Sequence, residues 1–355
     1  MKINNIEQKI SRALIFPRYS IASKGKIPQK HLSNNDPVLL DTSLGSQNAG
    51  DYIIMHFAER QLSMIWPRGD FNRIATHVPT RGVNASFSND LKILCGTNAI
   101  SANADKLRTR IHWIDLPSNP SIYAKSILTL AVGMRDMAEG EGISSKTASV
   151  LRYLLTDEYL HSVRDSNTER ALRSIGIENV INTACVTMWD LTPEFCASIP
   201  INKATDVLTT ITDYGFDSVN DGYMLRTLKK HYRNVYLWVQ GSEDLDKLHS
   251  MPESDGIELV QGGFAGLEQF VKEHGDIDYF GTRLHCGIYC LNHKIRSMIV
   301  TIDNRAADIQ RDTNIPTVNR PDLKRDMERL IEQPRSTDIH IPVENIQRWK
   351  EQFRK

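Results

Sequence analysis

The chain has 355 residues, 40% hydrophobic and 24% charged, which is typical of a globular protein long enough for two domains. Lys and Arg number 43, as do Asp and Glu, so charge gives no reason to expect binding to nucleic acid or an acidic membrane surface. No apolar run reaches the roughly 18–20 residues that span a bilayer. Residues 1–18 lack the apolar core of a secretion signal, and we therefore expect a cytoplasmic protein.

The first half of the chain alternates short apolar runs with helical patterns. The predicted strands are 37–42, 91–96, 126–133, 162–165 and 179–182, and the predicted helices are 52–64, 151–160 and 166–175. The loop 43–51 contains Asn48, Gly50 and Asp51, which suit sugar hydroxyls or, for the carboxylate, a general base. A tight turn followed by a helix cap at Asp51 would explain the same residues.

Arg164 ends the predicted strand 162–165, where the chain passes into a helix. A guanidinium at such a junction is a candidate ligand for an anion. In the alternative interpretation, Asp165 or Ser166 caps the helix and Arg164 pairs with a nearby acid. The residues alone leave both interpretations open.

The second half repeats the alternation, which predicts an α/β fold with parallel sheets and right-handed crossovers. Its predicted strands are 206–212, 234–240, 279–281 and 297–303, and its predicted helices are 222–232, 267–274, one from Leu284 and a terminal one at 343–353. Pro193 and Pro200 interrupt the pattern between the halves. We therefore predict domains at 1–195 and 196–355, with the terminal helix in the second.

The segment 278–291 is the most informative part of the sequence. Arg283 and His285 lie between the end of a predicted strand and the start of a predicted helix, where unpaired N–H groups favour an anion. The guanidinium would clamp a carboxylate or phosphate, and the imidazole would move a proton near neutral pH. Arg305 follows the next strand, 297–303, and parallel strands bring it to the same edge. The alternative is a surface arginine and a histidine that packs or caps.

Other sequence patterns give no reason to expect a metal site, a reactive cysteine pair or a nucleotide-binding motif. Asp276-Ile-Asp278 resembles an Asp-x-Asp metal motif, but it precedes its strand, away from the predicted ligand edge, so we expect no metal site. Cys286 and Cys290 lie one helical turn apart and are expected to be buried thiols. The sequence contains no phosphate loop, dinucleotide fingerprint or nucleophile elbow.

From about Val38 to Arg320 the chain resembles the polysaccharide pyruvyl transferase family. The resemblance is carried, in order, by residues 48–51, 162–165 with 172–176, 183–189, 281–285 and 303–305. Its most specific piece is Arg283-Leu-His285 followed by an apolar helix rich in small residues. The resemblance implies two Rossmann-like domains in a GT-B-like arrangement, with the active site in the interdomain cleft.

The resemblance also implies an activity, which is transfer of the pyruvyl group of phosphoenolpyruvate to sugar hydroxyls as a cyclic ketal, without a metal or cofactor. His285 and Arg283 would be catalytic, with His285 as the acid. The implied substrate-binding residues are Arg164, Leu284, Arg305, Asn48 and Asp51, with Arg305 standing where many relatives have lysine. The implied partners are phosphoenolpyruvate and a sugar or oligosaccharide acceptor. A lipid-linked acceptor would bring the protein to the inner face of the membrane.

Two other functions suit the same residues. A GT-B glycosyltransferase would use a basic crevice to hold the diphosphate of a nucleotide-sugar donor. A non-catalytic protein would bind a sugar or an anion on the same scaffold.

Overall fold

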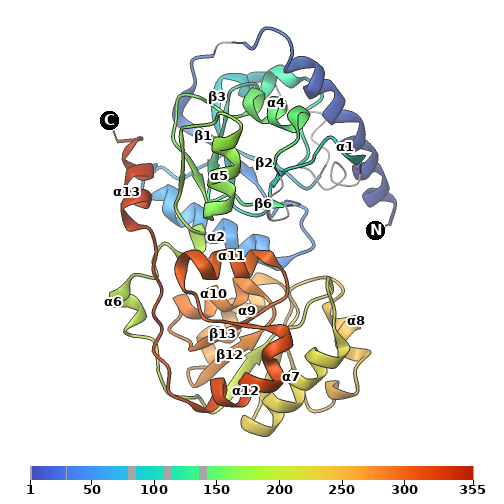
Figure 1. Ribbon diagram of the computed structural model, residues 1–355, viewed down its shortest axis with the longest axis vertical. Helices are drawn as coiled ribbons and strands as arrows, with labels where there is room; N and C mark the ends of the chain where they lie inside the picture. Colours follow the sequence, from blue (N-terminus) through green and yellow to red (C-terminus); the bar gives the residue numbers. More distant parts are fainter. Residues whose placement is uncertain (1, 29, 79–84, 108–113, 136–141, 355) are drawn as a thin grey trace. The chain divides into compact units, whose positions relative to one another are not determined.

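The computed structural model describes residues 2–28, 30–78, 85–107, 114–135 and 142–354 (Figure 1). For residues 2–8, 11, 85, 86, 304 and 305 it describes only the backbone. The chain forms two compact units. Unit 1 comprises Met1–Ser46, Ile54–Val186 and Pro342–Lys355, and unit 2 comprises Gln47–Ile53 and Thr187–Ile341.

Unit 1 is built around a parallel sheet with the strand order β2-β1-β3-β5. These strands are β1 (Ser33–Asp41), β2 (Arg73–Ala75), β3 (Asp90–Cys95) and β5 (Ile127–Leu130). Parallel bridges from Ile127 to Leu155 and from Val132 to Val163 continue the sheet towards a second parallel pair, β7 (His161–Val163) and β8 (Val180–Asn182). A short parallel pair, β4 (Ile100–Ser101) and β6 (Met134–Arg135), lies beside it. The inner strands β3 and β5 are mainly apolar and buried on both faces, as is typical of parallel sheets.

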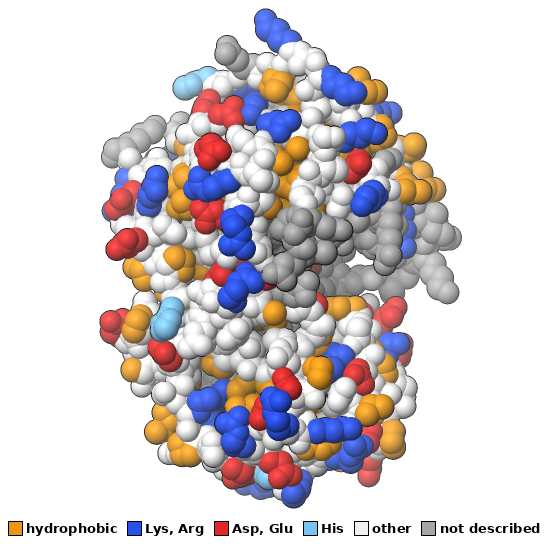
Figure 2. All heavy atoms as spheres, viewed as in Figure 1, with side chains coloured by type: hydrophobic (Ala, Val, Ile, Leu, Met, Phe, Trp, Pro, Cys, Tyr) orange, Lys and Arg blue, Asp and Glu red, His pale blue; other side chains and the backbone are white. Residues whose placement is uncertain are grey.

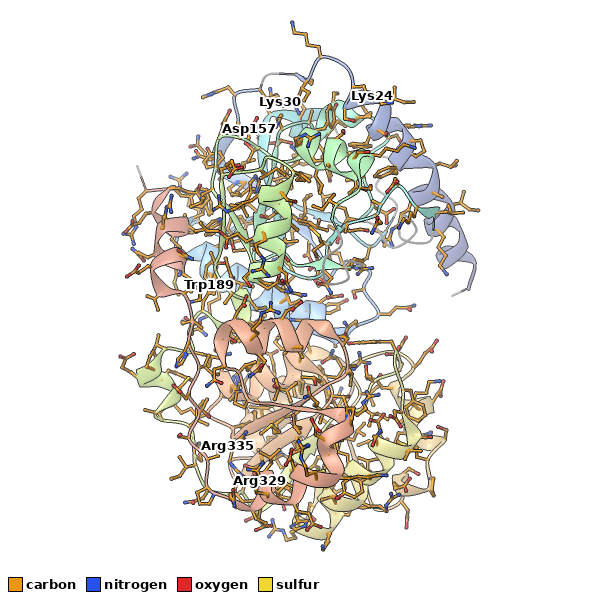
Figure 3. The ribbon with its side chains drawn as sticks, viewed as in Figure 1. Lys24, Lys30, Asp157, Trp189, Arg329 and Arg335 are labelled. Atoms are coloured by element: carbon orange, nitrogen blue, oxygen red, sulfur yellow. The ribbon has the colours of Figure 1, made fainter. Side chains whose placement is uncertain are left out.

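Helices α1 (Lys2–Ala22), α4 (Ser145–Leu154) and α5 (Ser166–Ser174) supply apolar side chains to the core of this unit. The unit also contains most of α2 (Ala49–Ser63) and all of α13 (Val343–Glu351) (Figure 1). Tyr19 of α1 meets Tyr153 of α4 edge to face, with ring centroids 6.1 Å apart. Lys30, after α1, donates to the carbonyl oxygens of Ser88 at 2.8 Å and Ile122 at 3.1 Å (Figure 3).

The terminal helix α13 belongs to unit 1, whereas the predicted boundary placed it in the second domain. Lys350 donates to Gln61 at 2.6 Å, and Asn345 donates to the carbonyl of Asn182 at 2.8 Å. Trp349 of the helix is fully buried. These long-range contacts, rather than position in the sequence, decide where the helix belongs.

Unit 2 contains a six-stranded parallel sheet with the order β11-β10-β9-β12-β13-β14. The strands are β9 (Asp206–Thr209), β10 (Val235–Trp238), β11 (Glu258–Val260), β12 (Ile277–Gly281), β13 (Ser297–Thr301) and β14 (Thr317–Asn319). Counted within the unit this order is 3-2-1-4-5-6, the Rossmann order, and it reverses direction between β9 and β12. Ligands of such sheets bind beyond the carboxyl ends of the strands at that reversal.

The strands of unit 2 are connected by α7 (Ser218–His231), α8 (Asp244–His249), α9 (Gly263–Glu273), α10 (Leu284–Asn292) and α11 (Asn304–Thr313). Helix α6 (Pro193–Cys196) precedes the first strand, and α12 (Leu323–Glu332) follows the last. Helices α7 and α12 lie side by side and share one apolar cluster with the sheet, including Leu228 and Met327 (Figure 1). Helix α10 packs against β13 so closely that a side chain at Gly287 would collide with Ile299. Trp189 is buried (Figure 3).

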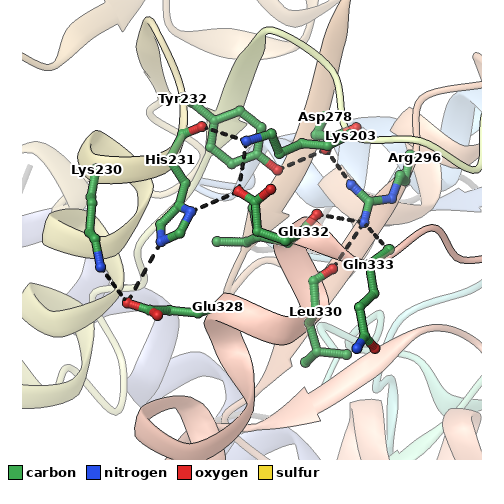
Figure 4. A network of polar contacts seen from close by, with 11 residues as sticks. Lys203, Lys230, His231, Tyr232, Asp278, Arg296, Glu328, Leu330, Glu332 and Gln333 are labelled. Atoms are coloured by element: carbon green, nitrogen blue, oxygen red, sulfur yellow. Dashed lines mark hydrogen bonds and ion pairs between the residues drawn. The ribbon is translucent and has the colours of Figure 1, made fainter.

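The amino edge of the unit 2 sheet is fixed by a buried ion pair. Asp278 accepts hydrogen bonds from Arg296 at 2.8 Å and from Tyr232 at 2.7 Å (Figure 4). Arg296 also donates to backbone carbonyls at the end of α12, including those of Leu330 and Gln333. Asp278 therefore has a structural role, and the described residues contain no cluster of three metal-ligating side chains.

On the face that Figure 2 shows, Lys and Arg side chains are interspersed with Asp and Glu over unit 2. Lys203 and His231 contact Glu332 at 2.7 and 2.8 Å, and Lys230 contacts Glu328 at 2.9 Å (Figure 4). Such exposed pairs contribute little stability individually.

Of the helices that the structure describes, none combines the length and the hydropathy needed to cross a membrane.

Candidate functional site

The turn from β12 to α10 lies at the reversal of strand order in unit 2. Thr282 donates its N–H to the carbonyl of Thr210, and the N–H of Arg283 is donated to the hydroxyl of Thr210, both at 3.1 Å. The hydroxyl of Tyr279 donates to the carbonyl of Arg283 at 2.8 Å. A side chain at Gly281 would lie 2.6 Å from the backbone nitrogen of Thr210, so only glycine permits this close approach. The turn is thus held in place on the neighbouring strand.

Arg283 is the N-cap residue of α10, and only 2% of it is exposed. Its Nη2 contacts Asp244 and lies 2.8 Å from Asp213, its Nε donates to the carbonyl of Ile211, and the guanidinium lies 5.0 Å from the ring centre of Tyr214. Burial alone would lower the pKa of Arg283, but the charges of Asp244 and Asp213 outweigh it and raise that pKa. The positive charge of the guanidinium is therefore compensated by carboxylates. The contacts named use Nη2 and Nε and do not involve Nη1.

Asp244 organises the carboxyl edge of the sheet. Its carboxylate accepts hydrogen bonds from the backbone N–H groups of Gly241 at 2.7 Å, Asp213 at 3.0 Å and Gln240 at 3.2 Å. Burial raises the pKa of Asp244, and the charge of Arg283 opposes that rise. One buried carboxylate thus connects the segments that follow β9, β10 and β12.

The loop before α2 contributes Asn48 to the same region, because Gln47–Ile53 groups with unit 2. Gln240 donates from Nε2 to Asn48 at 2.8 Å, and the backbone N–H of Gly50 donates to the same oxygen at 3.1 Å. The Oε1 atom of Gln240 is buried and has no hydrogen-bond partner among the described residues. A buried acceptor left in this state favours a ligand that donates to it.

These residues enclose a small pocket with a volume of about 20 Å³. It is lined by Asn48, Tyr214, Gln240, Thr282, Arg283, Leu284, His285, Val300, Ile302, Asp303 and Ala306. The volume suffices for a single water molecule, so a larger ligand would occupy the mouth of the pocket or require side chains to move. His285, the second residue of α10, is 8% exposed.

The structure thus brings together four of the seven predicted site residues, namely Arg283, Leu284, His285 and Asn48. Asp51 is buried in the first turn of α2, and it does not line the pocket. Arg305 is the second residue of α11, and its side chain lies outside the described residues.

Arg164 belongs to unit 1, where it follows β7. It is buried, contacts the side chain of Asn98 and lies 3.3 Å from the carboxylate of Asp165. Asp165 caps α5 through the N–H of Thr168 at 2.7 Å. The alternative interpretation of the sequence, in which Asp165 caps the helix and Arg164 pairs with a nearby acid, describes both contacts. A side chain at Gly133 would collide with the guanidinium, so the backbone leaves space for it.

Sequence reasoning missed the pocket residues that follow β9 and β10, which are Tyr214 and Gln240, and the carboxylates that hold Arg283, which are Asp213 and Asp244. The signal was present, because the strands 206–212 and 234–240 were predicted and their carboxyl ends share one edge with the strand 279–281. What the sequence did not show was the strand order, which makes β9 the direct neighbour of β12.

Comparison with known protein families matches residues 8–304 to the model of the polysaccharide pyruvyl transferase family. The chain belongs to this family. The resemblance seen in the sequence is thereby confirmed, and family membership makes the protein a transferase of the kind that pyruvylates polysaccharides. No curated protein gives a match.

Two solved structures show remote similarity. One is a UDP-GlcNAc 2-epimerase from Methanocaldococcus jannaschii, with 9% identity, a TM-score of 0.43, and coverage of 86% of this chain and 81% of that one. The other is the lipopolysaccharide outer core galactosyltransferase WaaB, with 10% identity, a TM-score of 0.38, and coverage of 70% and 67%. The observed α/β architecture with two parallel-sheet units is the predicted fold class.

Proposed function

We propose that the protein transfers the pyruvyl group of phosphoenolpyruvate to two hydroxyls of a sugar, in a polysaccharide or its precursor, and forms a cyclic ketal. The observation that carries this proposal is the placement of Arg283 and His285 in one pocket at the strand-order reversal of unit 2. Family membership supports the same reaction class.

The reaction needs an acid that protonates the methylene carbon of phosphoenolpyruvate. Protonated His285 delivers that proton, and positive character develops at C2. A sugar hydroxyl adds to C2 and loses its proton, and phosphate leaves with the electron pair of the C2–O bond. The second hydroxyl then adds to C2 and loses its proton, which closes the ketal. The proposal assigns no metal or cofactor to these steps.

The charge balance around Arg283 constrains how the donor binds. Arg283 is neutralised by Asp213 and Asp244, so an anionic donor gains little from it unless a carboxylate gives way. Asp213, 26% exposed, is the partner that can turn to solvent, whereas the side chain of Asp244 is fully buried. We assign the vacated Nη2 position, together with Nη1, to the carboxylate of phosphoenolpyruvate.

The remaining pocket residues suit the other ligand groups. Leu284 offers apolar contact to the donor methylene, and Gln240 offers its unpartnered Oε1 to a sugar hydroxyl beside Asn48. Arg164, Arg305 and Asp51 stay proposed substrate ligands on family resemblance alone. The proposal places the reaction in the cytoplasm, where a lipid-linked acceptor is reached from the inner face of the membrane.

The deciding experiment compares wild type with His285→Ala. The variant should lose phosphate release from phosphoenolpyruvate in the presence of acceptor sugars, while calorimetry shows donor affinity within about threefold of wild type. His285→Gln serves as the control for loss of the ring without loss of hydrogen bonding. Loss of donor affinity with unchanged turnover would contradict the role of His285 as the acid.

The donor is tested by thermal shift. Phosphoenolpyruvate should raise the melting temperature of wild type, because a ligand that binds only the folded state stabilises it. A panel of nucleotide sugars should leave the melting temperature unchanged. Stabilisation by a nucleotide sugar and none by phosphoenolpyruvate would instead identify a glycosyltransferase.

A further inference from the structure

Unit 1 contains a second and much larger pocket, with a volume of about 470 Å³. It is lined by Asn34, Asn35, Asp36, Pro37, Ile65, Trp66, Pro67, Arg68, Gly69, Asp70, Phe71 and Phe353. These residues come from the start of β1, the segment after α2 and the end of the chain after α13. The volume lies within the roughly 300–1,000 Å³ of small-molecule sites, and nothing in the proposed transfer reaction uses this pocket.

Three aromatic rings contribute to its apolar surface, beside Pro37, Ile65 and Pro67. The ring centre of Trp66 lies 4.7 Å from that of Phe353, at an interplanar angle of 53°, and 6.4 Å from that of Phe71, at 83°. The indole N–H of Trp66 is donated to the carbonyl of Asn34 at 2.7 Å. Because this donor is already used, Trp66 presents ring surface to a ligand, and its orientation is fixed before any ligand arrives.

The wall formed by the end of the chain is held by independent contacts. Phe353 stacks on Tyr159 at 5.7 Å and meets Trp349 edge to face at 5.1 Å. The side chain of Gln352 accepts from the N–H of Leu160 at 2.6 Å and donates to its carbonyl at 3.2 Å. A pocket fixed in this way loses little conformational freedom when it binds a ligand.

The polar residues of the pocket are asparagines and aspartates, with Arg68 as the basic residue. Asp36, Asp70 and Arg68 are exposed, so the lining contains two carboxylates and one guanidinium and carries a net negative charge. This balance disfavours phosphate and carboxylate ligands. The carboxylates accept hydrogen bonds from hydroxyl groups. The amide of Asn34, which also hydrogen-bonds to the side chain of Tyr159, and that of Asn35 can donate and accept.

Fixed ring surfaces beside hydroxyl-binding carboxylates and amides match the two sides of a pyranose, which are its C–H faces and its hydroxyl rim. We infer that this pocket binds sugar units of a neutral oligosaccharide, separately from the site at Arg283. The binding itself does not depend on pyruvyl transfer. Only the view that the bound oligosaccharide is part of the acceptor polymer rests on the proposed function.

The test uses the full-length protein and a panel of neutral trisaccharides built from glucose, galactose, mannose or N-acetylglucosamine. Calorimetry and intrinsic tryptophan fluorescence should show saturable binding of at least one of them. Phe71→Ala and Asp70→Asn should each weaken that binding by at least about fivefold. Trp66→Phe should remove the fluorescence change. The control Glu178→Gln, which removes an exposed unit 1 carboxylate, should bind as wild type does.

Circular dichroism and melting temperatures establish that each variant is folded. His285→Ala, which disables the proposed transfer, should retain the trisaccharide affinity of wild type, and added phosphoenolpyruvate should not compete. The inference is overturned if wild type binds no trisaccharide, if Phe71→Ala binds as tightly as wild type, or if phosphoenolpyruvate displaces the sugar. Failure of transfer alone would leave these binding results unchanged, so the two proposals fail separately.

Discussion

Arg283 shares its guanidinium between two carboxylates that differ in exposure. Asp244 is fully buried and also accepts three backbone hydrogen bonds, so it cannot leave without large rearrangement. Asp213 is 26% exposed and is held by the guanidinium at 2.8 Å. If an anionic donor replaces Asp213, then Asp213 competes with the donor for the same nitrogen.

Asp213→Asn should therefore tighten binding of phosphoenolpyruvate, by about three- to tenfold, because it removes a competing negative charge and keeps the shape of the side chain. Calorimetric titration of wild type and variant at the same ionic strength measures this. Asp246→Asn, which removes a carboxylate at the third position of α8, is the matched control and should leave donor affinity unchanged. Equal or weaker donor binding by Asp213→Asn would count against displacement.

Removing Arg283 alone is a poor test of donor binding, because it leaves Asp244 buried without its charge partner. Arg283→Met should lower the free energy of unfolding by about 3–5 kcal/mol, as broken buried pairs do. The double variant Arg283→Met with Asp244→Asn should recover part of that loss, since it removes both charges. Chemical denaturation of the two variants and wild type measures the difference. Equal stability of the single and double variants would show that the pair is not coupled.

At the scale of single elements, each predicted strand overlaps an observed strand. The observed helix ends differ from the predicted ones where a capping side chain or a long-range contact sets them. Helix 222–232 was predicted, but α7 begins at Ser218 because Asp217 accepts from the N–H groups of Val219 and Asn220 at 3.1 and 3.0 Å. Helix 151–160 was predicted, but α4 ends at Leu154 because Leu155 joins the sheet beside Ile127. A capping residue such as Asp217 can be recognised in the local sequence. The pairing of Leu155 with Ile127 depends on the fold and cannot be recognised there.

The Asp217 cap gives a prediction for the element it starts. Asp217→Ala should lower the free energy of unfolding by about 1 kcal/mol, because it leaves two N–H groups of α7 without their acceptor. Asp217→Asn or Asp217→Ser should retain most of the stability, since both side chains can cap. Denaturant midpoints of the three variants measure the effect. A loss in the Ser variant as large as in the Ala variant would indicate a role other than capping.

For the whole molecule, alternation of strands and helices predicted the α/β class and two units, but it did not predict which segments join which unit. Helix α13 packs on residues far away in sequence, such as Gln61 and Asn182, and Asn48 bonds to Gln240 across most of the chain. Such pairings depend on the order of strands and on which apolar face covers which sheet. The part of the site carried by Arg283 and His285 was predictable, because both lie within one local motif.

The two units should also respond differently to acid. In unit 1, burial lowers the pKa of His161 from 6.5 to about 4, and the neutral ring accepts from the N–H of Thr129 at 3.2 Å and donates to the carbonyl of Thr156 at 2.9 Å. In unit 2, burial raises the pKa of Asp221 from 3.8 to about 6. Between pH 6.5 and 4 the unfolded chain binds more protons than folded His161, so acid destabilises unit 1. Folded Asp221 binds more protons than the unfolded chain, so acid opposes unfolding in unit 2.

Hydrogen exchange measured by mass spectrometry at several pH values separates these effects, because it follows peptides from each unit. After correction for the intrinsic exchange rate, protection around β7 should fall on acidification by up to about 1.4 kcal/mol per pH unit, and protection around α7 should hold or rise. His161→Gln can make both hydrogen bonds without a titrating ring, so it should flatten the slope in unit 1 and leave α7 unchanged. The same slope around β7 in wild type and His161→Gln would show that another group, such as His77 with its pKa also lowered to about 4 mainly by burial, controls the response.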